Sequence, residues 1–160
     1  MGNFIKLLFS IIIFIFLSFY CAFPFQIVSH EFEYALYKKN QLIWSFKTKE
    51  FFQKETGDFE GKDIYLINKE KGLKIWANKG FYQKWEDKFI LQDNVHLVTS
   101  EYGEVYTQKL IFYPKKNLIF TDEEVILIKK GLTVKGKGLI YEIETGNFKV
   151  EGKAKVKWKI

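Results

Sequence analysis

The sequence has very few of the residues on which most catalytic sites depend. Its 160 residues include two histidines, one cysteine and one methionine, and all 25 basic residues are lysine, so arginine is absent. A zinc site needs three or four Cys, His or carboxylate ligands, and a nucleophilic triad needs a histidine that a third group orients. His30, His96 and Cys21 supply neither arrangement. We therefore expect no enzyme activity, no metal and no cofactor.

The single cysteine also excludes a disulfide framework, so a hydrophobic core has to hold the folded part together. The net charge is +6, but the lysines alternate with acidic and apolar residues and form no single basic block. Base readout and bidentate phosphate contacts favour arginine, and nucleic-acid-binding surfaces cluster their positive charge. We therefore expect no nucleic acid partner.

A long apolar run lies near the N-terminus. Residues 7–23 read LLFSIIIFIFLSFYCAF without a charge, and extension to Val28 gives a helix of roughly 33 Å against a hydrocarbon core of roughly 30 Å. Bulky side chains stand where a signal peptidase needs small ones, which favours an uncleaved anchor over the alternative, a cleaved signal peptide. Lys6 precedes the run and acidic residues follow it, so the positive-inside rule places residues 1–6 in the cytoplasm, residues 7–28 in the membrane and residues 29–160 outside.

After this run the chain shows almost no helical periodicity. Alternating apolar and polar residues, rich in β-branched and aromatic side chains, continue from Phe32 to Lys159, a pattern typical of β-strands. Turn residues such as Asp93-Asn94 and Asp122-Glu123 separate the runs. The pattern gives about thirteen short strands, which leave no room for helical crossovers, so we predict an all-β, antiparallel fold.

Segments of this β region align at a spacing of about 30 residues. Residues 79–97, 109–127 and 137–158 each begin with a lysine and an aromatic-rich run and continue as strand, turn, strand, corner, strand. Chance similarity among β-strands is the alternative explanation, because alternating patterns are degenerate. If the similarity is real, copies must stack to cover their apolar faces, which leaves a free edge strand at each end.

The order of these features resembles a known family. Asp93-Asn94-Val95-His96-Leu97, the run 106–113 and the run 135–148 follow a single N-terminal span. The chain is similar to the LptC family, the bitopic inner-membrane subunit of the lipopolysaccharide transport bridge, which has an OstA-like domain. The similarity covers essentially the whole chain and is clearest from Gly80 onward, while residues 48–62 match no pattern that we can name. It implies an open antiparallel β-jellyroll of stacked repeats in the periplasm, preceded by one N-terminal transmembrane helix.

The resemblance also implies a function. Members accept lipopolysaccharide from the inner-membrane Lpt ABC transporter and pass it along a groove of the jellyroll to the periplasmic OstA-like bridge protein, without catalysis. An alternative is a membrane-tethered β-domain that acts as an assembly scaffold, or that binds another envelope lipid.

Alternation and repeat position give the candidate residues. The lipid groove is expected on one face of the repeats, at Phe89, Leu91, Val95, Leu97, Leu110, Phe112, Val125, Leu127, Leu139 and Tyr141. The same residues would equally fill a closed core, and the sequence does not decide between these roles. The edge strands that pair with partners are expected at the two ends, with Phe32, Tyr34, Leu42 and Trp44 toward the transporter and Phe148, Val150, Val156 and Trp158 toward the bridge protein. His96 faces away from Val95 and Leu97 and is expected at the surface or beside a neighbouring strand.

Overall fold

The structure is a computed structural model of the chain, and it describes residues 26–158. These residues form one sheet of ten antiparallel strands and one short 3-10 helix. The elements are β1 (Ile27–Lys38), β2 (Gln41–Gln53), β3 (Phe59–Asn68), β4 (Leu73–Gln83), β5 (Lys88–Thr99), β6 (Gly103–Tyr113), η1 (Pro114–Lys116), β7 (Leu118–Lys129), β8 (Leu132–Glu142), β9 (Asn147–Val150) and β10 (Lys155–Trp158).

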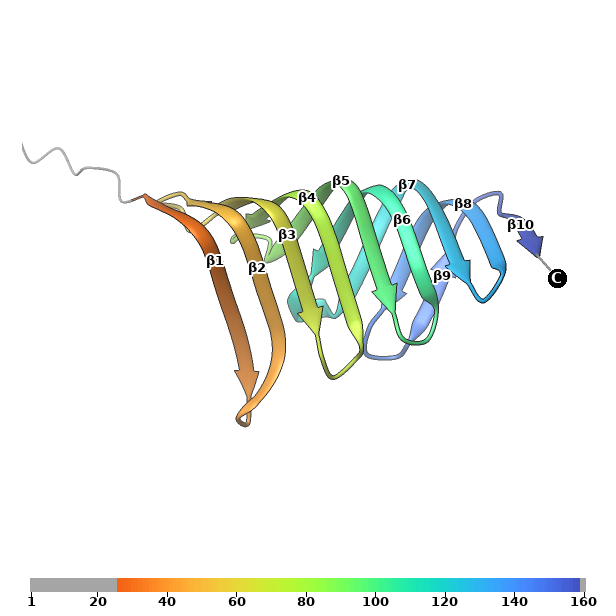
Figure 1. The fold of residues 1–160 in the computed structure, drawn as a ribbon, viewed down its shortest axis with the longest axis horizontal. Helices are drawn as coiled ribbons and strands as arrows, with labels where there is room; N and C mark the ends of the chain where they lie inside the picture. Colours follow the sequence, from red (N-terminus) through yellow and green to blue (C-terminus); the bar gives the residue numbers. More distant parts are fainter. Residues whose placement is uncertain (1–25, 159–160) are drawn as a thin grey trace, which may run out of the picture.

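Each strand from β1 to β8 pairs with the next one along the chain. Figure 1 shows that the long strands bend and that the sheet rolls over, with β1 at one end and β9 and β10 at the other. β10 pairs with residues 132–135 of β8, and β9 pairs with residues 139–142, so two short strands share the last edge. The predicted all-β, open antiparallel roll is therefore confirmed.

Bulges in the middle of the strands produce the bend. The register of β5 shifts between Gln92 and Val95, and the register of β7 shifts just after Thr121. At the first of these sites Asp93 and Asn94 have positive φ angles of 63° and 53°, which Asp and Asn tolerate better than most residues. The sequence pattern predicted turns at these points. Pairs of predicted short strands instead merge into β5, β7 and β8, which is why the structure has fewer strands than expected.

Buried threonines satisfy backbone carbonyls along the bend. Thr48, Thr107 and Thr121 are all less than a tenth exposed. Their hydroxyls donate, at 2.6, 2.9 and 2.7 Å, to the carbonyls of Lys62, Glu124 and Lys109. A buried carbonyl without a partner costs about 1–3 kcal/mol, so these hydrogen bonds stabilise the bent form of the sheet.

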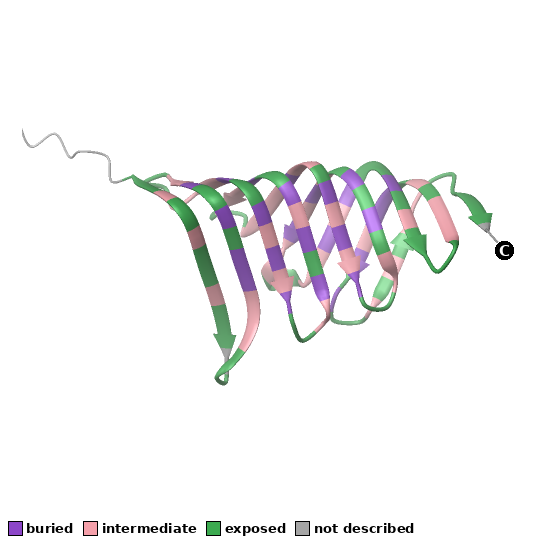
Figure 2. Ribbon diagram, in the orientation of Figure 1, coloured by how far each residue is buried: buried purple, intermediate pink, exposed green. Residues whose placement is uncertain are grey.

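The bend divides the sheet into two leaves whose inner faces pack together. On the first leaf, one inward row follows the strand register through Tyr34, Phe46, Leu66, Ile75, Leu97, Val105, Leu127, Val134 and Val156. On the second leaf, the corresponding row runs through Phe59, Tyr82, Phe89, Phe112, Ile119, Tyr141 and Phe148. Ile75 and Leu97 in the middle are fully buried, whereas Tyr34 and Val156 at the ends are 55% and 62% exposed. The core thus fills the middle of the roll and is uncovered at both ends (Figure 2).

On the side opposite the bend, turns of the two leaves meet near the C-terminal end. Tyr102, in the β5–β6 turn, donates its hydroxyl to the carbonyl of Gly146 in the β8–β9 turn. Its ring stacks on Phe148 with 4.7 Å between the ring centroids. Gly103 follows with φ 90°, and a Cβ there would collide with the carbonyl of Ile128, so this turn requires glycine. These contacts close the margin between the leaves at this point.

β1 begins directly after the N-terminal apolar run. Ile27 and Val28, the last two residues of the predicted span, pair with Gln53 and Phe52 in the sheet, so they belong to β1 and not to a helix. The remainder of that prediction, residues 7–25, lies outside the described residues. Between residues 26 and 158 the structure contains no helix that is long and apolar enough to span a bilayer.

Candidate functional site

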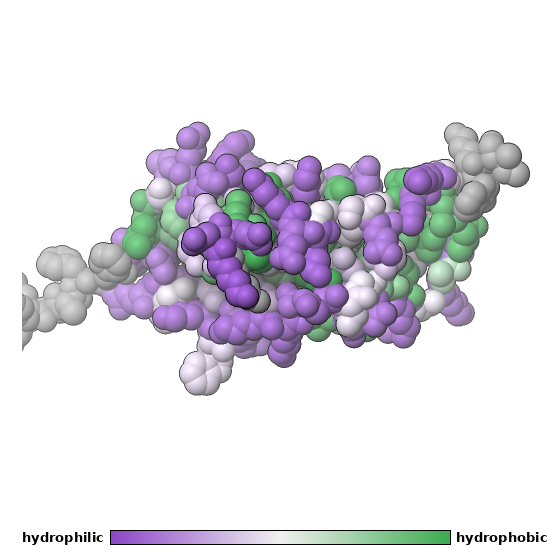
Figure 3. Space-filling model, turned by 90° about the horizontal axis from the view of Figure 1, so that it is seen from below, coloured by the Kyte–Doolittle hydropathy of each residue, from purple (hydrophilic) through white to green (hydrophobic). Residues whose placement is uncertain are grey.

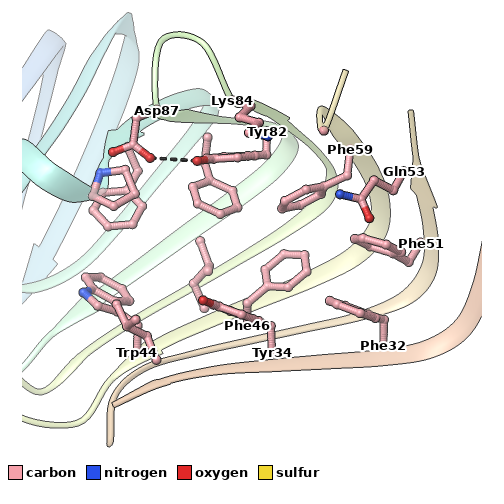
Figure 4. Close-up of a pocket in the computed structure, with 16 residues that line it drawn as sticks. Phe32, Tyr34, Trp44, Phe46, Phe51, Gln53, Phe59, Tyr82, Lys84 and Asp87 are labelled. Atoms are coloured by element: carbon pink, nitrogen blue, oxygen red, sulfur yellow. Dashed lines mark hydrogen bonds between the residues drawn. The ribbon is translucent and has the colours of Figure 1, made fainter. Parts of the chain in front are cut away.

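An apolar cavity of about 510 Å³ lies between the two leaves at the β1 end of the roll, a volume typical of small-molecule sites. Phe32, Tyr34 and Trp44 on one wall face Phe59 and Tyr82 on the other (Figure 4). Nine of the 16 lining residues are aromatic, and the full set is Phe32, Tyr34, Leu36, Trp44, Phe46, Phe51, Gln53, Gly57, Phe59, Leu66, Tyr82, Lys84, Asp87, Phe89, Phe112 and Pro114.

Aromatic contacts join the two walls at the inner end of the cavity. The ring centroids of Phe46 and Phe59 are 5.4 Å apart, and those of Trp44 and Phe112 are 4.6 Å apart. Such pairs contribute about 0.5–1.5 kcal/mol beyond the burial of their surface. They hold the leaves together where the cavity ends and the densely packed core begins.

β1 forms the outer wall and leaves the cavity open. Tyr34 and Leu36 line the cavity yet are 55% and 45% exposed. Within the described chain β1 pairs with β2 alone, so its other side presents free backbone donors and acceptors. Seen from the side of the turns, most of the surface is hydrophilic, and hydrophobic atoms show mainly toward the ends of the roll (Figure 3). The cavity therefore opens at an unpaired sheet edge.

Polar groups stand at the rim, on the turns of the second leaf. The Tyr82 hydroxyl donates to Asp87 Oδ1 at 2.7 Å, and Asp87 Oδ2 lies 3.7 Å from Lys115 Nζ. Lys84 also lines the cavity at this rim. An apolar cavity lined by one lysine, with a second lysine beside Asp87, suits an amphiphile that has apolar chains and an anionic head group.

We expect Tyr82 to be among the last tyrosines to ionise. Burial, followed by the hydrogen bond to Asp87, raises its pKa from 10.0 to about 12. Because the folded pKa is raised, the associated stabilisation is complete below about pH 10 and is lost as the pH rises through about 12. The check is the difference in tyrosinate absorbance between the wild type and Tyr82→Phe, with circular dichroism to show that both remain folded. A difference curve centred on the ordinary tyrosine pKa would contradict this environment.

Phe89 and Phe112 are the members of the predicted groove set that line this cavity. The others lie deeper along the roll. Leu91, Val95, Leu97, Leu110, Val125 and Leu139 are at most 1% exposed, Tyr141 is 5% exposed, and Leu127 is half-buried against them. They face the interior, as the alternation predicted, and there they pack against one another. That they contact lipid stays a prediction.

The residues predicted for the partner edges lie at the two ends of the roll. On the N-terminal side, Phe32 and Tyr34 belong to the edge strand β1, whereas Leu42 and Trp44 belong to β2, which is paired on both sides. On the C-terminal side, Phe148 and Val150 belong to β9, and Val156 and Trp158 belong to β10. Phe32, Tyr34 and Trp44 also line the cavity, so cavity and edge are adjacent at the β1 end.

Sequence reasoning missed much of the cavity wall. Phe46, Phe51, Phe59 and Tyr82 were not among the candidate residues, and two of them lie in the stretch 48–62 that matched no known pattern. The available signal was the density of aromatic residues on both sides of the β2–β3 turn.

His96 lies on the outer face, within a ladder of stacked rings. Its ring centroid is 5.2 Å from that of Trp76 and 4.4 Å from that of Tyr106. Glu104 Oε2 accepts the Tyr106 hydroxyl at 2.6 Å and lies 3.1 Å from His96 Nε2, and these hydrogen bonds lower the pKa of Glu104. The expected cross-strand position of His96 is confirmed. In the part of the chain that the structure describes, no three His, Cys, Asp or Glu side chains gather as a metal site would require.

Comparison with protein families identifies the family of the chain. Residues 25–158 match the family described as lipopolysaccharide-assembly, LptC-related. The chain belongs to this family. Membership places the LptC-related chain in lipopolysaccharide transport, as a component without enzymatic activity.

Solved structures support the fold of this LptC-related chain. It resembles the crystal structure of LptH from Pseudomonas aeruginosa, described as the LptA-homologous periplasmic component of the conserved lipopolysaccharide transport device. The TM-score is 0.51 at 10% sequence identity, over 84% of this chain and 94% of that chain. At this identity the likeness shows the fold alone. No curated protein sequence matches the chain.

Proposed function

We propose that this LptC-related chain receives lipopolysaccharide from an inner-membrane ABC transporter and passes it, through the interior of the roll, to a periplasmic OstA-like bridge protein. The cavity carries this proposal, since it is apolar, lined by aromatic rings and open at an unpaired edge, in a chain of the lipopolysaccharide-assembly family. A span that ends before Ile27 would hold the chain in the inner membrane as a single-pass protein, with residues 1–6 in the cytoplasm and the roll in the periplasm.

The chemistry of the cavity fits the acyl part of such a lipid. Burial of each methylene group is favourable by about 0.8 kcal/mol, so an acyl chain gains stability when it enters between the leaves. Lys84 lines the mouth and Lys115 is close to Asp87 at the same rim. These ammonium groups are placed to meet phosphates of a head group that stays outside the roll.

The two ends of the sheet fit the two partners. β1 is the edge beside the cavity mouth, and β9 and β10 form the edge at the other end. An unpaired edge strand accepts a strand from another chain through main-chain hydrogen bonds. In this arrangement the transporter meets β1, where lipid enters, and the bridge protein meets the last edge, where lipid leaves.

Photo-crosslinking in cells tests the proposal. A crosslinking amino acid at Tyr34 or Phe89, both of which line the cavity, should capture lipopolysaccharide. The matched control is Gln92, which neighbours Leu91 and therefore points to the outer face, where it pairs with Lys79 and Lys109. Capture at the control site equal to capture at Tyr34 and Phe89, or capture at none of them, would contradict a lipid path through the interior.

An assembly scaffold with a closed core is the second candidate, and the dense packing in the middle of the roll favours it. Leu91, Leu97 and Leu110 have no exposed surface. In that case the cavity sites would capture no lipid, while crosslinkers on β1 and β9 would still capture protein partners.

A further inference from the structure

Trp85 is the most conspicuous apolar side chain on the surface. It lies in the turn between β4 and β5, and it is 97% exposed. A tryptophan ring buries more apolar surface than almost any other side chain when it finds a partner, so a fully exposed one gives the folded chain no packing energy.

Hydrogen bonds to the neighbouring turn and within the turn itself fix the backbone on either side of Trp85. The backbone N–H of Lys84 donates to Asp58 Oδ1 of the β2–β3 turn at 2.8 Å, and the N–H of Asp87 donates to the carbonyl of Lys84 at 3.3 Å. A Cβ on Gly57 would collide with the side chain of Lys84, so the two turns are in close contact. The neighbours of Trp85 are thus fixed while its own ring projects into solvent.

Trp85 lies at the margin of the sheet where the chain enters from its N-terminal segment. The strand register aligns Ile27 with Gln53, Gln53 with Phe59, and Phe59 with Tyr82. Ile27 and Tyr82 are therefore three strand spacings apart, roughly 14 Å along the sheet. The chain before Ile27 and the turn after Tyr82 leave the sheet on the same side. Two more exposed apolar residues start β1 there, Ile27 at 37% and Val28 at 68% exposure.

The sequence before Ile27 indicates what lies beyond this margin. Residues 7–23 are uncharged and apolar, and residues 24–26 alone separate them from Ile27. Fully extended, this connection reaches roughly 14 Å. If the apolar run is in a bilayer, as the proposed function holds, this margin of the sheet lies at the membrane surface. Tryptophan is enriched at that depth, because its ring is apolar and its N–H can still donate to water or a head group.

We propose that the β4–β5 turn places Trp85 in the interfacial layer of the phospholipid bilayer into which the N-terminal run inserts. Lys84 and Asp87 of this turn line the cavity mouth, so insertion of Trp85 holds the mouth against the membrane. Glu86 in the same turn is bound to Lys88 at 2.7 Å, which offsets its negative charge near anionic head groups. The bound partner is the lipid surface itself, a contact distinct from the cavity and from the paired edges.

Fluorescence quenching in vesicles tests this contact. The full chain is reconstituted into vesicles of phosphatidylethanolamine and phosphatidylglycerol, with or without bromine on the acyl chains. The emission of Trp85 is obtained as the difference between the wild type and Trp85→Phe, a change that leaves packing intact because the ring is 97% exposed. The control is the difference for Trp76→Phe, since Trp76 is stacked between Tyr65 and His96 on the outer face.

We expect brominated lipid to quench most of the Trp85 emission and little of the Trp76 emission. Equal Trp85 emission in both kinds of vesicle would overturn the proposal, as would equal quenching of the two residues, which would indicate non-specific adsorption. A change in Trp85 emission that needs the transporter and is independent of bromine would identify a protein contact instead, and would also overturn it. Photo-crosslinking of lipopolysaccharide at Tyr34 and Phe89 is unaffected by these outcomes, so it separates this proposal from the proposed function.

Discussion

Proline at Val150 is expected to abolish capture of the periplasmic bridge protein. The N–H of Glu151 donates to the carbonyl of Gly138 at 2.9 Å, toward β8. Because donors alternate in direction along a strand, the N–H of Val150 points to the free edge. Proline removes this donor and is tolerated on edge strands, so the partner loses a hydrogen bond while the β8–β9 ladder keeps its own. The measurement is co-purification of the bridge protein with the full chain from membranes.

Val150→Thr provides the matched control. Threonine keeps the backbone donor and the β-branched shape that packs against the core, so it should capture the bridge protein at the wild-type level. Both variants should still associate with the transporter, because β1 lies at the other end of the sheet. Undiminished capture by Val150→Pro would show that the bridge protein pairs elsewhere.

Leu110→Ala is expected to lower the free energy of unfolding by about 2–5 kcal/mol. Leu110 has no exposed surface and pairs with the equally buried Leu91, so truncation leaves a void between the leaves. Tyr34→Ala should change stability by no more than about 0.5 kcal/mol, because Tyr34 is 55% exposed at the open end. It should instead weaken capture of lipopolysaccharide by a crosslinker at Phe89.

Denaturant titration of the purified chain measures the first effect, and crosslinking yield in cells measures the second. The pair of variants separates two roles that alternation alone cannot distinguish. If Leu110→Ala were as stable as the wild type, the interior at that point would be a preformed groove, and the densely packed core described here would be wrong.

The sequence was sufficient to predict which residues of the repeats face the interior. Leu91, Val95 and Leu97 are buried and His96 lies outside, as a period of two requires. The bulges that bend the strands were not predictable in the same way. Asp93-Asn94 is an ordinary turn signal, and the same residues also suit the left-handed positions of a bulge. Which of the two forms depends on whether the strand continues into the opposite leaf, and that is decided by packing across the roll.

The cavity was less predictable than the core, for a related reason. Alternation identifies residues that point inward, but it carries no information on how far apart the facing residues lie. At Leu97 the opposite leaf is in contact, whereas at Tyr34 the inward side chain meets open space because β1 is the last strand. The repeats were also clearest after Gly80, while much of the cavity wall comes from β1 and β2.

The hydrogen bond between Tyr102 and Gly146 has a consequence for how any long ligand occupies the roll. Strands β1 to β8 run from one leaf to the other through the bend (Figure 1). The Tyr102 hydroxyl joins the β5–β6 turn to the β8–β9 turn on the opposite side, near the C-terminal end of the roll. If the roll carries lipopolysaccharide as proposed, its acyl chains can enter sideways between the leaves at the β1 end, while the head group stays outside. Beyond the hydrogen bond between Tyr102 and Gly146, an acyl chain has to move along the axis of the roll, unless the Tyr102 hydroxyl releases its acceptor. In the proposed transport, entry from the side and exit through the end are thus two different movements within one sheet.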